Sequence, residues 1–107
     1  MTSMQQLADA AKKERSKAES FRVEANKSMD KAQQNMDAPD SMQQYSVQAQ
    51  KNEQKAVVHD QQAMKYDTEA AQLEITATEI NRKKVELQLL MQSEINKLDL
   101  EEKYIRG

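Results

Sequence analysis

The chain has 107 residues, of which 37% are hydrophobic, 4% aromatic and 32% charged, with one glycine, one proline and no cysteine. This composition excludes a large compact core, a sheet-rich fold, disulfides and thiol chemistry. The net charge of -2 also argues against a nucleic-acid-binding protein, which normally presents a strongly basic face.

No secretory signal is visible in the sequence. Its start becomes polar and charged within a dozen residues, which is unlike a secretory signal. The longest aliphatic-rich stretch, residues 85–91, is too short to cross a bilayer. We therefore expect no membrane span, and either a cytoplasmic protein or one exported by a route that needs no cleaved signal.

Nine of the thirteen alanines lie on two ladders with seven-residue spacing, one on each side of the only proline, Pro39. Such a repeat is typical of helices that wind around each other along a narrow line of contact. Because alanine is small, the helix axes are expected to approach toward the short end of the usual range of about 8 to 10 Å. The sequence predicts an all-α fold, an antiparallel helical hairpin or coiled coil with a long second helix that forms oligomers.

The first helix is expected over residues 3–36. Ser3 and Gln6 have the spacing of a capping box, in which each side chain binds the other residue's backbone N–H. The inner stripe of this helix is predicted to consist of Met4, Leu7, Ala8, Ala11, Ala18, Phe21, Ala25, Met29, Ala32 and Met36. A turn over residues 37–40 follows, with Pro39 tolerated only in the first turn of the next helix.

The second helix is expected over residues 41–105, because this stretch contains neither proline nor glycine. Together the two helices are expected to form one elongated domain over residues 1–107. The predicted contact line between them, called the hairpin seam, consists of Ala11, Ala18, Phe21, Ala25, Ala32, Ala49, Ala56, His59, Ala63, Tyr66, Ala70, Leu73 and Ala77.

The two predicted helices differ in length. If Met36 faces Met42, facing residue numbers add up to 78, so the first helix extends only to about residue 77 of the second. Beyond this point the large apolar residues are concentrated, with 13 in the 33 positions from 73 to 105 against 14 in residues 1–72. Soluble monomers rarely expose so large an apolar patch, because burying it in an interface is favourable. The predicted oligomer or partner interface is Leu87, Leu89, Leu90, Met91, Ile95, Leu98, Leu100 and Ile105.

His59, the only histidine, falls on the seam between Asn52 and Tyr66. The favoured interpretation is a polar layer that fixes the register of the hairpin, as buried asparagines do in coiled coils. Two alternatives are a pH-sensing group and a metal ligand, although a lone histidine without a second ligand makes a poor metal site.

The sequence contains no pattern typical of catalysis. It has no glycine-rich phosphate loop and no serine or cysteine arranged with the histidine, and its carboxylates lie on open helix surfaces. The basic clusters at residues 12–17 and 82–84 are interrupted or flanked by acids, which favours a solvated helix face over a phosphate site. We therefore expect no enzyme, no cofactor, no metal and no nucleic-acid partner.

The segment APDSMQQYSVQAQ, residues 38–50, resembles the turn and second-helix start of type III secretion needle and filament subunits, through Pro39, Met42, Gln43, Gln44 and Tyr45. The resemblance implies a small helical hairpin that polymerises through its terminal helices and is exported without a cleaved signal. The sequence departs from the family in its longer second helix, in the missing second proline of the turn and in its ending EEKYIRG.

These observations predict a self-assembling structural subunit whose apolar C-terminal helix packs against copies of itself. The alternative is a small chaperone or adaptor that binds an amphipathic helix of a partner protein. A third arrangement breaks the long helix near residues 92–96 and folds it back into a three-helix bundle. Whether copies close into a ring, a bundle or an open filament depends on interface angles that composition does not encode.

Overall fold

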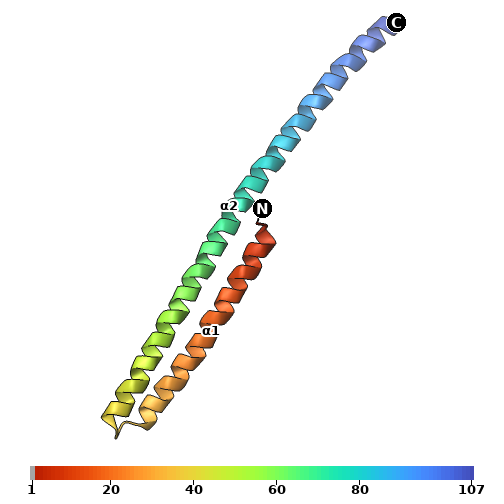
Figure 1. The fold of residues 1–107 in the computed structure, drawn as a ribbon. Coiled ribbons are helices and arrows are strands. Elements are labelled where there is room, and N and C mark those ends of the chain that lie inside the picture. The colour runs from red at the N-terminus through yellow and green to blue at the C-terminus, as the bar shows by residue number, and fades with distance from the viewer. Residues whose placement is uncertain (1) are drawn as a thin grey trace. The chain divides into compact units, whose positions relative to one another are not determined.

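The computed structural model describes residues 2–107, and the described residues form two helices and no strand. The first helix, α1, comprises Met4–Gln34, and the second, α2, comprises Pro39–Arg106 (Figure 1). The predicted all-α helical hairpin is confirmed.

The start of α1 is fixed by the predicted capping box. The backbone N–H of Gln6 donates to the Ser3 hydroxyl at 3.1 Å, and the N–H of Ser3 donates to the Gln6 side-chain carbonyl at 2.8 Å. The helix ends at Gln34, two residues before the predicted end. Asn35 leaves the helical conformation, with φ at -111°, and its side-chain amide donates to the Lys31 carbonyl at 2.7 Å. That bond satisfies one of the free carbonyls of the last turn.

The turn occupies residues 35–38, so the prediction of 37–40 was two residues late. Within it, the N–H of Ala38 donates to the Asn35 carbonyl at 2.9 Å. Pro39 is the first residue of α2, where its missing N–H costs no helical hydrogen bond. Asp40 lies in the first turn, where a negative charge interacts favourably with the positive end of the helix dipole.

Helix α2 is continuous over its 68 residues. Residues 92–96, where the three-helix alternative needed a turn, are helical, so that alternative is wrong. The helix ends at Arg106, and Gly107 adopts a φ of +78°, the left-handed conformation that commonly terminates helices. By its internal packing the chain divides into two units, Met1–Ala71 and Gln72–Gly107.

In the unit Met1–Ala71, α1 and the first part of α2 lie side by side and antiparallel (Figure 1). The core consists of one leucine and seven alanines, each at most 6% exposed: Leu7, Ala11, Ala18, Ala25, Ala32, Ala49, Ala56 and Ala63. Seven members of the predicted seam are therefore buried. A core of methyl groups requires the two backbones to come close together, as the seven-residue alanine ladders predicted.

The register of the hairpin agrees with the predicted one. Four contacts join the helices at defined positions: Arg15 with Asp67, Arg22 with Asp60, Glu14 with His59, and Phe21 with His59. The residue numbers in these pairs add up to values from 73 to 82, on both sides of the expected 78.

Other predicted positions of the inner stripe and seam are less buried. Met4, Ala8, Met29 and Met36 are exposed. Met4 is the first residue of α1 and Met36 lies beyond its end, whereas Ala8 and Met29 fall outside the alternation of three and four residues that the buried positions follow. That alternation places Ser28 among the buried residues, which the stripe omitted. Four seam residues of the unit Met1–Ala71 are half-buried: Phe21, His59, Tyr66 and Ala70. The first three have side chains larger than a methyl group and lie at the edge of the narrow contact, and Ala70 lies near its end. Leu73 is half-buried as well. Ala77 is exposed.

Candidate functional site

A polar and aromatic cluster interrupts the alanine core of the hairpin. His59 of α2 faces Glu14 of α1, with 2.6 Å between the imidazole Nδ1 and the carboxylate Oε2. The His59 ring also stacks on the Phe21 ring, with centroids 5.4 Å apart and the planes within 4°. The Lys55 ammonium lies 5.5 Å from the centroid of the Phe21 ring, within the range of a cation–π contact.

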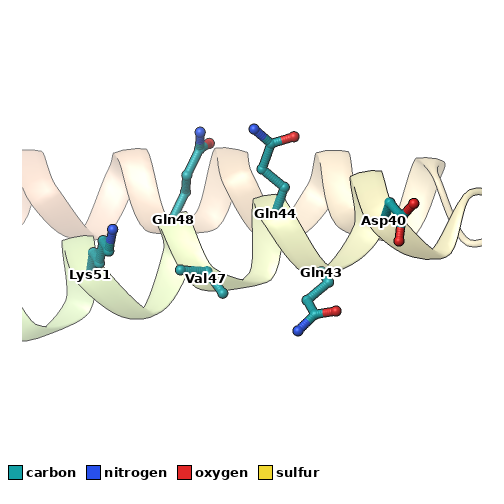
Figure 2. Close-up of a pocket in the computed structure, with 6 residues that line it drawn as sticks. All are labelled: Asp40, Gln43, Gln44, Val47, Gln48 and Lys51. Atoms are coloured by element: carbon teal, nitrogen blue, oxygen red, sulfur yellow. The ribbon is translucent and has the colours of Figure 1, made fainter.

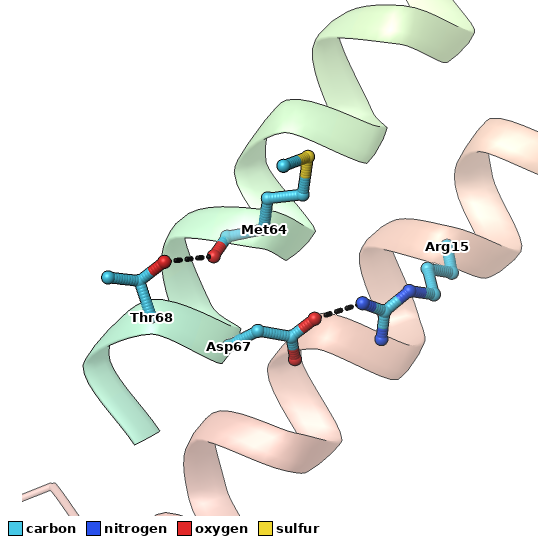
Figure 3. A network of polar contacts seen from close by, with 4 residues as sticks. All are labelled: Arg15, Met64, Asp67 and Thr68. Carbon is cyan, nitrogen blue, oxygen red and sulfur yellow. Dashed lines mark hydrogen bonds and ion pairs between the residues drawn. The ribbon is translucent and has the colours of Figure 1, made fainter. Parts of the chain in front are cut away.

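Ion pairs flank this cluster on the surface of the hairpin. Arg22 donates to the Asp60 carboxylate at 2.5 Å and lies 3.6 Å from that of Glu53. The hydrogen bond to Asp60 raises the pKa of Arg22 above its ordinary value. One heptad earlier on α1, Arg15 pairs with Asp67, and Thr68 beside it donates to the Met64 carbonyl at 3.0 Å (Figure 3).

These polar partners were not anticipated, although the sequence contains their signal. Arg15 and Arg22 are seven residues apart, as are Asp60 and Asp67, so both pairs repeat with the period of the alanine ladders. Glu14 likewise occupies a regular position, three residues after Ala11. The cluster fits the interpretation of His59 as part of a polar layer, because one imidazole meets one carboxylate at a single level of the hairpin.

The charge of the Glu14 carboxylate is expected to contribute to the stability of the hairpin. Its side chain is 15% exposed, and the hydrogen bond from His59 lowers the pKa of Glu14 below its ordinary value, with a smaller contribution from Lys17. A carboxylate whose pKa is depressed by folding stabilises the fold above its unfolded-state pKa of about 4.3, and the contribution disappears as pH falls through the folded-state value.

We therefore predict that Glu14→Gln lowers the melting temperature at neutral pH and that the gap to the wild type closes on acidification. Circular dichroism melts between about pH 3 and pH 7 measure this gap, below and above the unfolded-state value. The comparison removes the effect of all other carboxylates, because they titrate in both proteins. A gap that stays constant across the series would contradict a role for the Glu14 charge.

An open depression beside the cluster is lined by Phe21 of α1 and by five side chains of α2: Lys51, Gln54, Lys55, Val58 and His59. Among residues 2–107, no three His, Cys, Asp or Glu side chains come together in a way that could hold a metal ion. A depression on α2 is lined by six side chains of that helix alone (Figure 2): Asp40, Gln43, Gln44, Val47, Gln48 and Lys51. Since no second element contributes a wall, this depression is a feature of an ordinary helix surface.

Three of the seven basic residues in the two clusters, Arg15, Lys17 and Arg82, form ion pairs. Arg15 binds Asp67, and Lys17 lies 3.5 Å from Glu14. Arg82 pairs with Glu86 at 2.6 Å and lies 3.9 Å from Glu79. This arrangement agrees with a solvated, salt-bridged helix face.

The unit Gln72–Gly107 presents its apolar side chains to solvent. Every residue from Glu74 to Gly107 is exposed. All eight residues of the predicted interface are at least 46% exposed, up to 81% for Ile105. Neither α1 nor α2 contains a stretch apolar and long enough to span a bilayer.

These apolar residues lie on two faces of the helix. At about 3.6 residues per turn, one face holds Leu73, Ile80, Leu87, Met91, Ile95, Leu98 and Ile105, and we call it the heptad face. The other, the opposite face, holds Ile75, Leu89, Leu100 and Tyr104. The predicted interface residues are thus divided between the two faces, with Leu90 between them.

Comparison of the chain with protein-family models, curated proteins and solved structures gives no significant match.

Proposed function

We propose that this chain is a non-enzymatic structural subunit that assembles with copies of itself through residues 73–105 of α2. The observation that carries the proposal is the exposure of twelve large apolar side chains between Ile75 and Ile105, from 46% to 88% each. Burying one such side chain is worth about 1.5 to 3 kcal/mol, so association has a large driving force.

Two features favour assembly over an internal role for this segment. The hairpin core of Met1–Ala71 is complete with one leucine and seven alanines. The exposed apolar residues of α2 also occupy two faces rather than one. A helix with two apolar faces can contact two neighbours, which permits assemblies larger than a pair. We propose that the heptad face forms pairs and the opposite face joins pairs together.

The resemblance of residues 38–50 to needle and filament subunits agrees with such a role, and membership of a secretion apparatus stays a prediction. The rival hypothesis is an adaptor that offers the same heptad face to the amphipathic helix of another protein. The two differ in what the purified chain does alone. A purified structural subunit associates with copies of itself, whereas a purified adaptor stays unassembled until its partner protein is added.

Sedimentation velocity over a range of micromolar concentrations, followed by electron microscopy, tests the proposal. We expect species larger than the monomer whose share rises with concentration, and regular particles or fibres in the micrographs. A single 12.3 kDa species at every concentration would end the self-assembly proposal and favour the adaptor.

A further inference from the structure

The heptad face of α2 is complementary to itself in one orientation. We infer that two copies pair antiparallel through residues 73–105, with facing residue numbers that add up to 178 and Lys84 of one copy against Glu94 of the second. This inference rests on the proposed self-assembly and specifies its first contact.

The spacing of the heptad face determines the pairing. Its members at alternating steps of three and four residues are Leu73, Ile80, Leu87, Met91, Leu98 and Ile105. Antiparallel pairing centred on residue 89 sets Ile80 against Leu98 and Leu87 against Met91, each twice because of the two-fold symmetry. It also brings Ile105 to the level of Leu73, which is already half-buried in the single chain. The whole apolar stripe is then covered, whereas a shift by one heptad in either direction leaves part of it uncovered.

The charged residues within the heptad face favour the same antiparallel arrangement. Some positions at the three- and four-residue spacing of the heptad face hold charged residues, and Lys84 and Glu94 are two of these. Both side chains are exposed in the single chain. In the antiparallel pair they face each other, giving two opposite-charge contacts inside the interface. In a parallel pair Lys84 would face Lys84 and Glu94 would face Glu94, and like charges at such positions are strongly unfavourable.

The remaining charge within the stripe does not reverse this preference. Glu101 comes opposite Ala77 of the second copy, whose small side chain leaves the carboxylate access to water. A parallel pair would instead place the two Glu101 carboxylates against each other. The antiparallel arrangement therefore avoids a third like-charge contact within the interface.

Two kinds of like-charge approach occur at the edges of the antiparallel pair, each twice because of the two-fold symmetry. Lys83 approaches Lys97 of the second copy, and Lys97 already lies 3.4 Å from Glu94 of its own helix. Glu74 approaches Glu102, which already lies 3.3 Å from Arg106 of its own helix. Solvent screens the repulsion at such exposed positions, so these edge contacts cost less than like charges inside the stripe.

Charge exchange tests the orientation. We expect Lys84→Glu alone, or Glu94→Lys alone, to raise the dissociation constant of the pair at least about tenfold, because each creates two like-charge contacts. The double variant Lys84→Glu/Glu94→Lys should restore association to near the wild-type value. In a parallel pair each single variant would only replace one like-charge contact by another, so the dissociation constant would not change. An unchanged dissociation constant in the single variants overturns the inference. So does a double variant whose association stays weaker than that of the wild type.

Cross-linking gives a second, independent readout, because the native chain has no cysteine. We mix chains carrying Ile80→Cys with chains carrying Leu98→Cys, one of the two variants being labelled with ¹⁵N, and oxidise the mixture mildly. Mass spectrometry then distinguishes disulfide-linked dimers of two different variants from dimers of the same variant. Antiparallel pairing gives mainly mixed dimers, in which a disulfide joins one variant to the other. Mainly identical dimers, each made of two copies of the same variant, overturn the orientation while self-association stands. A monomeric wild type would instead remove the proposed function itself.

Discussion

Replacement of Ala56 by leucine is expected to lower the free energy of unfolding of the hairpin by about 1 to 3 kcal/mol or more. Ala56 is 0% exposed, in a core built almost entirely of methyl groups. Three additional heavy atoms find no space there unless the helices separate, and separation would weaken the contacts of the neighbouring alanine layers.

Chemical denaturation followed by circular dichroism measures this loss, at equal protein concentration because self-association also contributes to apparent stability. Ala71→Leu is the matched control, since Ala71 lies on the same helix in an exposed position and leucine has nearly the helix propensity of alanine. We expect Ala71→Leu to change stability by less than about 0.5 kcal/mol. Equal effects of the two substitutions would contradict a close-packed alanine seam.

The double substitution Leu87→Asp/Leu98→Asp is expected to convert the assembled protein to monomer. Both residues lie on the heptad face and are 61% exposed in the single chain, so the hairpin unit Met1–Ala71 loses no buried contact. In an assembly each aspartate would bring an unpaired charge into an apolar interface, which costs several kcal/mol per site. Sedimentation velocity provides the measurement, and circular dichroism checks that helix content is retained.

The double substitution Leu89→Asp/Leu100→Asp is the matched control, with residues 66% and 68% exposed on the opposite face. It introduces the same charges and the same loss of helix propensity. We expect it to retain pairs and to lose only the larger assemblies. Monomers from both variants would show that the two faces do not act separately, and undiminished assembly of Leu87→Asp/Leu98→Asp would refute the assigned interface.

If the pairing inference holds, the chain has two kinds of helix contact. Within the hairpin, alanines bring the helices close together, and polar contacts such as Glu14 with His59 and Arg22 with Asp60 set the register. Between copies, larger leucine and isoleucine side chains would supply the burial, with Lys84 and Glu94 setting the orientation. Large side chains suit a contact between chains because they supply more buried area per residue, which has to offset the entropy lost on association.

The sequence by itself determined the helical fold, the antiparallel hairpin and its approximate register. These follow from local signals: the seven-residue alanine ladders, the capping box at Ser3 and the single proline before a long stretch without helix breakers. It also located the exposed apolar segment, because the difference in reach depends only on helix lengths and the position of the turn.

The tertiary structure alone decided which polar groups meet. Whether Glu14 reaches His59, and whether Arg22 reaches both Asp60 and Glu53, depends on the stagger and rotation of one helix against the other. A shift of one residue would change these partners while leaving every local pattern intact.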